Sequence, residues 1–181
     1  MNPNNERLSE YMEQILTTTQ DAKTALCEHE GGPADGVPLM MWVTEEHGIA
    51  VCPLPVPEAD GVSMPQIMDY ALRKAFVELG KPMFGAFIAE ALIRQGSEQD
   101  LSNFRRGDLQ REFQKNPMAV TECMTVLVFD GAGKMRHAVI SYKYNDKGMP
   151  VYDKPQYNEH EVHGAVADAI DGFFEVFVRG W

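Results

Sequence analysis

Two long apolar segments separated by a four-residue turn constrain the fold of this chain more than any other feature. Residues 118–129 and 134–144 flank the sequence Asp-Gly-Ala-Gly at positions 130–133. Glycine-rich polar connections between apolar runs are typical of β-hairpins. A second polar turn, at residues 145–148, leads into a short strand at 149–153. The pattern therefore predicts a β-meander, and a sheet built from such hairpins is largely antiparallel.

Three more strands are predicted upstream of this meander. Residues 38–44 and 48–53 are short apolar runs joined by a polar link that suits a hairpin turn. Residues 82–93 are apolar throughout, which is typical of a central strand with both faces covered. A buried helix has the same kind of composition, so the sequence is compatible with either a strand or a helix over residues 82–93.

Three helices complete the predicted order. Apolar residues recur at three- and four-residue steps over residues 6–29, which places them on one face of a helix. Ser63 and Gln66 have the spacing of a capping box, and Gly80 stands where that second helix should end. A third helix is predicted to begin at Asn158, which would act as its cap.

These elements predict one α+β domain over residues 1–181, with the order α-β-β-α-β-β-β-β-α. Because hairpins dominate, we expect a largely antiparallel sheet with the helices packed on one face. The N-terminal helix region, residues 1–33, is the part that the pattern leaves open as a peripheral addition.

Charge and cysteine content narrow the class of protein. The net charge is −11, and residues 1–62 carry 11 acidic and 2 basic residues, a net −9. Such a surface disfavours nucleic-acid binding, which needs clustered Lys and Arg. Three widely spaced cysteines predict neither a disulfide framework nor a zinc site, which favours a cytoplasmic protein. No apolar run is long enough to cross a membrane, and the polar first ten residues do not resemble a secretory signal.

Glu90 and Glu122 are the strongest candidates for chemistry. Side chains alternate faces along a strand, so each carboxylate is predicted to lie on an apolar face. A buried carboxylate is costly unless it is paired or protonated. The functional interpretation is an acid/base or metal-binding pair. The structural interpretation is that each carboxylate pairs with a basic side chain such as Arg105 or Arg106. Arg105, Arg106 and His137 are also candidate binding residues.

Three histidines are weaker candidates. His137 shares its predicted strand face with Ser141 and Lys143, which is either a nucleophile cluster or the solvated face of an amphipathic strand. His160 and His163 are three residues apart and could share a helix face as metal ligands. The alternative for this pair is two ordinary polar residues in a first helical turn.

One stretch resembles a known group of proteins. It comprises residues 89–91 (Ala-Glu-Ala), 116–117 (Asn-Pro) and 121–123 (Thr-Glu-Cys), followed by the strand, Asp-Gly turn and strand. Together they are similar to uncharacterised small α+β proteins of bacteria and their phages, over roughly residues 82–145. Ala89 and Leu92 stand where that group has Ser and Trp. The resemblance implies no activity, but it aligns Glu90 and Glu122 with acidic positions of the group's pattern.

The sequence favours a non-enzymatic accessory protein that binds another protein, with a second copy of itself as one candidate partner. The absence of a catalytic motif, the acidic charge and the many Met and aromatic residues support this hypothesis. A phage or mobile-element origin follows from the resemblance alone, and no cofactor is predicted. Two alternatives stay open: an enzyme that uses Glu90 and Glu122, and an acidic mimic of nucleic acid.

Overall fold

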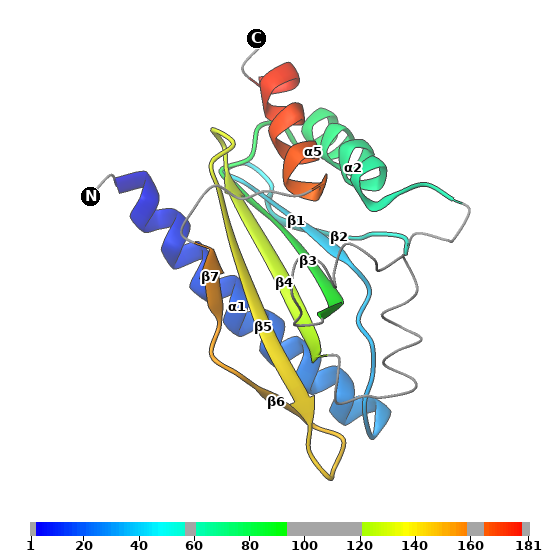
Figure 1. Cartoon of the computed structure of the whole chain (residues 1–181). Coiled ribbons are helices and arrows are strands. Elements are labelled where there is room, and N and C mark those ends of the chain that lie inside the picture. Colours follow the sequence, from blue (N-terminus) through cyan, green and yellow to red (C-terminus); the bar gives the residue numbers. More distant parts are fainter. Residues whose placement is uncertain (1–2, 57–60, 94–120, 159–164, 179–181) are drawn as a thin grey trace, which may run out of the picture.

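The protein folds as three α-helices and a seven-stranded antiparallel sheet in the part of the chain that the structure describes (Figure 1). The structure is a computed structural model, and it describes residues 3–56, 61–93, 121–158 and 165–178. The helices are α1 (Pro3–Glu30), α2 (Met64–Leu79) and α5 (Ala165–Phe173), which continues as a π-helix over Phe174–Val178. None of them combines the length and the apolar composition that crossing a bilayer requires. The predicted α+β class is confirmed.

The strands run in the order β2-β1-β3-β4-β5-β6, and β7 also pairs with β5. Their bounds are β1 Leu39–Thr44, β2 Gly48–Pro53, β3 Phe84–Ile93, β4 Thr121–Asp130, β5 Met135–Tyr144, β6 Pro150–Tyr152 and β7 Gln156–Asn158. The segment 82–93 is therefore a central strand and not a helix. The run β4-β5-β6 is the predicted meander, and β3 pairs with its first strand. Asn158 ends a strand that pairs with His137, so it does not cap a helix as predicted.

The helices cover both faces of the sheet, whereas the sequence predicted them on one (Figure 1). α1 lies diagonally across one face, and α2 and α5 pack side by side on the other. The central strands β3 and β4 carry apolar side chains on both faces, so each face needs a cover. The periodicity of a helix shows which of its own faces is apolar but not which face of a sheet it meets. The sequence therefore did not predict that the helices divide between the two faces.

α1 contributes to the core on its face of the sheet. Its apolar stripe is buried against alternate residues of β3, β4 and β5; the helix residues of the stripe are Leu8, Met12, Ile15 and Leu16, each at most 4% exposed. Burial of one such side chain stabilises the fold by about 2 kcal/mol. The N-terminal helix, which the sequence left open as peripheral, thus packs in one of the two cores.

The second core lies between the opposite face of the sheet and the pair α2 and α5. Trp42 of β1 is at its centre, and its ring makes edge contacts with Phe129 and Phe173. The indole N–H of Trp42 donates to the carbonyl of Gly80, the residue after α2, at 3.1 Å. This bond satisfies the only polar atom of the indole and fixes the end of α2 over β1.

Candidate functional site

The two glutamates that the sequence selected lie on the same face of the sheet, the one that α1 covers. Glu90 belongs to β3, where its partner across β4 is Met124, and Glu122 belongs to β4, where its partner is Leu92. The two carboxylate-bearing residues are therefore diagonal neighbours on adjacent strands. Met124 packs in the α1 core, which identifies the face.

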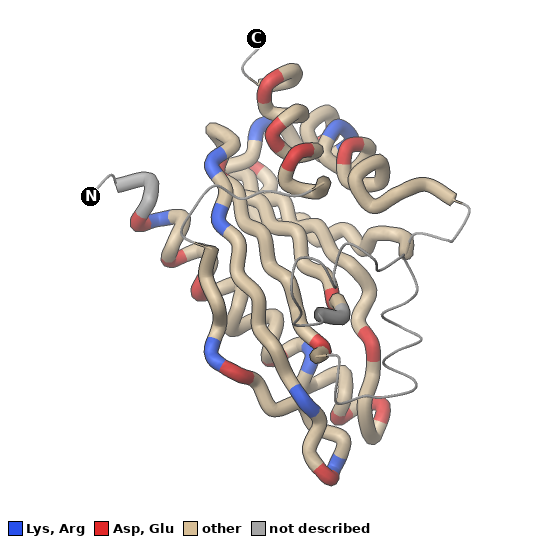
Figure 2. The backbone as a smooth tube through the Cα atoms, viewed as in Figure 1, with Lys and Arg blue, Asp and Glu red and all other residues tan. Residues whose placement is uncertain are grey.

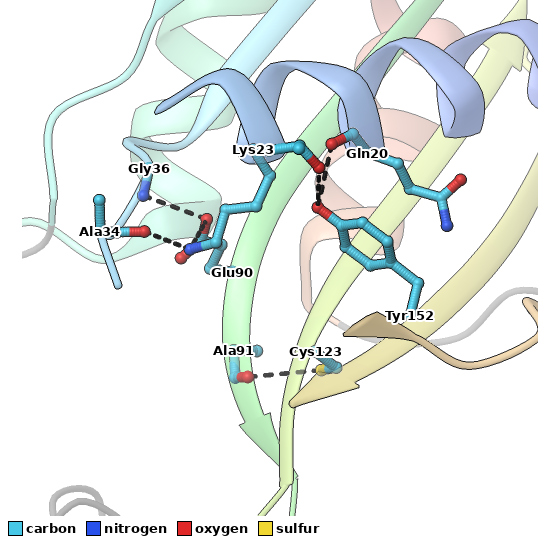
Figure 3. Close-up of polar contacts among 9 residues, drawn as sticks. Gln20, Lys23, Ala34, Gly36, Glu90, Ala91, Cys123 and Tyr152 are labelled. Atoms are coloured by element: carbon cyan, nitrogen blue, oxygen red, sulfur yellow. Dashed lines mark hydrogen bonds and ion pairs between the residues drawn. The ribbon is translucent and has the colours of Figure 1, made fainter. Parts of the chain in front are cut away.

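The Glu90 carboxylate contacts residues of two other segments, α1 and the segment that follows it (Figure 3). Its Oε1 atom lies 2.8 Å from Nζ of Lys23, on α1, and it accepts the backbone N–H of Gly36 at 3.1 Å. Lys23 also donates to the carbonyl oxygen of Ala34. The segment that leaves α1 is thus bound to both members of the ion pair.

Lys23 is almost fully enclosed, with a side chain that is 2% exposed, against 20% for Glu90. Its ammonium lies 5.1 Å from the ring centre of Tyr142 and 5.7 Å from that of Tyr144, within the range of cation–π attraction. Burial alone would lower the pKa of Lys23, but its contacts with Glu90 and Tyr144 outweigh the burial and raise that pKa. Lys23 therefore stays charged in the folded protein.

Glu122 has a different environment. Burial raises the pKa of its carboxyl, the charge of Lys23 lowers it, and the charges of Asp35 and Glu90 raise it further. The net result is a raised pKa, so a proton is held more tightly than on an exposed glutamate. Within the described residues, no hydrogen bond or ion pair engages the Glu122 carboxylate.

The contacts of this cluster fit a structural ion pair better than a catalytic pair. A general base must reach its substrate proton with a free lone pair. The Glu90 atom Oε1 is instead directed to Lys23 and Gly36, inside the fold (Figure 3). No group of three or more His, Cys, Asp or Glu side chains suited to a metal ion occurs among the described residues. Among the described residues, the basic partner of Glu90 is Lys23.

His137, the other predicted site residue that the structure describes, does not join this cluster. His137 pairs with Leu127 on β4, on the face that α2 and α5 share, and its Nε2 lies 2.6 Å from the hydroxyl of Thr125. Burial lowers the pKa of His137, which favours the neutral ring. Arg105, Arg106, His160 and His163 lie outside the described residues.

A larger feature lies between α2 and the β1–β2 hairpin. It is an open groove of about 1000 Å³, with α2 as one wall and β2 with the following residues 54–56 as the other. Six residues that define it are Trp42, Cys52, Leu54, Ile67, Tyr70 and Ala71. Trp42, Leu54 and Ala71 are buried and form the floor, whereas Cys52 and Tyr70 are exposed at the sides.

The groove is apolar in most of its lining, and two exposed acidic residues precede the strand that forms one wall. Lys74 and Glu78 of α2 are the charged residues that line it. Glu45 and Glu46 occupy the turn just before β2, and both are exposed. The described Lys and Arg residues are spread along the backbone over several elements (Figure 2).

A scan of protein-family models, a search of curated proteins and a search of solved structures each found no match to this chain.

Sequence reasoning missed both Lys23 and the groove. Lys23 interrupts the apolar spacing of α1 with a charge, between Gln20 and the buried Cys27, and this signal could have marked it as a buried cation. The groove has no comparable signal, since its walls come from β1, β2 and α2. Only the two apolar residues between prolines mark this segment in the sequence: Val56 is exposed at the rim, and Leu54 is buried in the floor.

Proposed function

We propose that this protein is a binding protein that takes an apolar segment of another protein into the groove between α2 and the β1–β2 hairpin. The observation that carries the proposal is an open apolar groove with exposed apolar side chains at its rim. Val56, Val62 and Tyr70 line the groove and are 63%, 56% and 69% exposed. Side chains of this kind, gathered around one hollow, are typical of interaction sites.

The dimensions of the groove also support a binding role. Pockets for ligands usually measure about 300–1,000 Å³, so this groove is at the upper end of that range. Its floor is rigid, because the Trp42 ring is held by the Gly80 carbonyl and by two phenylalanine rings. A preformed floor lowers the ordering cost of binding. Tyr and Trp are also the residues that most often dominate binding energy at protein interfaces.

The alternative, an enzyme that uses Glu90 and Glu122, has less support. Glu90 is held by Lys23 and by the Gly36 amide, and both contacts stabilise the fold whether or not a substrate is present. The groove lies on the other face of the sheet, with α2, while both glutamates project toward α1. The binding proposal therefore rests on the groove alone and uses neither glutamate.

The test is site-specific photocrosslinking in cells where the protein is native. A photoreactive phenylalanine analogue replaces Tyr70, at the groove rim, in one variant. In the matched control it replaces Val77, which lies on the same helix, is 81% exposed and does not line the groove. We expect a discrete crosslinked protein from position 70 and none from position 77.

A second pair of variants tests the same contact without a crosslinker. Val62→Lys places a charge at the groove rim, whereas Val77→Lys places the same charge elsewhere on the surface. We expect the partner that crosslinks to position 70 to be lost from Val62→Lys and retained by Val77→Lys. Equal crosslinking at both positions, or equal retention by both lysine variants, would show that the groove is not the binding site.

A further inference from the structure

The outer edge of β2 forms part of the groove. β2 is the terminal strand of the sheet, and among the described residues it pairs only with β1. Val51 pairs with Met41, which packs on the α1 face, so its side chain points away from the groove. Val51 nevertheless lines the groove. The groove therefore reaches the backbone of β2 as well as its side chains.

The direction of the β2 backbone groups follows from one hydrogen bond. The N–H of Leu54 donates to the carbonyl of Pro38 at 2.7 Å, so residue 54 directs its peptide groups toward β1. In an antiparallel pair, hydrogen-bonded and non-hydrogen-bonded positions alternate. Cys52 and Ala50 therefore also bond to β1, while Val51 and Ile49 direct their N–H and C=O groups to the open edge.

Such an edge accepts a strand from another chain. In strand addition, the backbone of an extended peptide supplies hydrogen bonds and its alternate side chains enter pockets. Here the edge-facing groups of Ile49 and Val51, which pair with none of the described residues, are the backbone sites, and the apolar groove beside them is the pocket. A helix or a small apolar molecule would fill the groove but leave these backbone groups without protein partners.

Charge defines the partner further. Glu45 and Glu46 precede β2, and Glu78 lines the groove. Among the described residues, Lys74 is the only basic one that lines the groove. Lys or Arg beside the inserted segment would complement these acids. A second copy of the chain is disfavoured, because each copy carries −11 and the copies repel.

We propose that the occupant is an extended segment of a partner protein that adds to β2 as a strand, with apolar residues at alternate positions and basic residues at its flanks. This inference rests on the proposed function of the groove. It names the backbone of Ile49 and Val51 as the part that recognises the partner.

The test is a selection of random linear peptides, displayed on phage, against the full-length protein, followed by affinity measurements of the selected peptides on Val51→Pro. Proline removes the edge-facing N–H without removing a bond to β1, so the hairpin should stay intact. Val51→Thr keeps that N–H and serves as the control. We expect selected peptides with alternate apolar residues and basic flanks, which bind Val51→Pro about tenfold or more weakly than Val51→Thr, a loss of about 1.4 kcal/mol.

N-methylation of the selected peptides tests strand addition with the unaltered protein. Methylation at alternate residues should weaken binding about tenfold, while methylation at the residues between should have little effect, since only every second N–H of an added strand faces its partner. This measurement also tests strand addition if Val51→Pro fails to fold. Binding that is insensitive to N-methylation at every position would overturn strand addition.

The variants separate the failure of this inference from the failure of the proposed function. Peptides that are lost with Val62→Lys but are insensitive to Val51→Pro and to N-methylation would overturn strand addition and leave the groove as the binding site. A selection that yields no peptide would overturn strand addition alone, because the crosslinking test of the groove does not depend on peptides. Peptides insensitive to both substitutions would count against the groove and against strand addition.

Discussion

Nζ of Lys23 on α1 lies 2.8 Å from Oε1 of Glu90 on β3, inside the layer between the helix and the sheet. Lys23 also donates to Ala34, and Glu90 accepts from Gly36, so the segment after α1 is held by both charges. Tyr152 of β6 adds a further link from the same region, because its hydroxyl donates to the carbonyl of Gln20 at 2.9 Å (Figure 3). The C-terminal half of α1 is therefore positioned by polar contacts, and its N-terminal half by apolar packing.

Lys23→Met should be strongly destabilising. The substitution leaves the Glu90 carboxylate without its counter-ion in a mostly enclosed site, and the loss of one partner of a buried pair costs about 3 kcal/mol. The double variant Lys23→Met/Glu90→Leu removes both charges and should recover much of that loss. Urea denaturation of the single and double variants measures the coupling. Additive effects of the two substitutions would show that the pair contributes no interaction energy.

Glu122→Gln should increase stability at neutral pH. The folded pKa of Glu122 is raised mainly by burial, so the folded state keeps a proton that the unfolded chain releases at lower pH. The stability of the native protein therefore falls as the pH rises from about 4.5, the ordinary value, through the raised folded pKa. The glutamine variant lacks this loss, and the two proteins should converge below pH 4.5. Thermal unfolding measured across this pH range gives the comparison, and parallel curves would contradict the assignment.

Gly85→Ala should destabilise the sheet although the change is a single methyl group. Gly85 on β3 pairs with Phe129 on β4, and a Cβ at residue 85 would lie 2.1 Å from the phenylalanine ring. The ring is fully buried and cannot move without disturbing Trp42, so we expect a cost of about 2 kcal/mol. Gly32→Ala is the control, because no atom lies within 4 Å of its new methyl group. Equal melting temperatures for the two variants would contradict this packing.

Cys52 should be the only thiol that reacts quickly with a thiol reagent such as Ellman's reagent. Cys27 and Cys123 are 0% and 1% exposed, and burial raises the pKa of Cys123 to about 11, which suppresses its thiolate. We expect one fast equivalent in the native protein, which Cys52→Ser removes, and three in guanidinium chloride. Because Cys52 lines the groove, a bound peptide should slow its reaction. Fast reaction of two or three native thiols would contradict the burial of the other cysteines.

The sequence by itself determined most of the elements of this protein, with β7 as an exception. The apolar alternation of β4 and β5 and the glycines between them predicted the meander, because strand periodicity and turn chemistry are local properties. The same parity rule predicted apolar faces for Glu90 and Glu122, and both lie on the α1 face. It could not name the partner of Glu90, because Lys23 is distant in sequence and reaches Glu90 only once α1 crosses the sheet.

Tertiary structure alone decided how the layers divide and where the groove lies. The sequence of an amphipathic helix does not show which face of a sheet the helix covers. β3 and β4 have apolar area to bury on both faces, and this placed α1 opposite α2 and α5. The groove arises where α2 overlies the hairpin without filling the space above β2. Its shape depends on the distance between packed elements, and residue periodicity along one chain does not encode that distance.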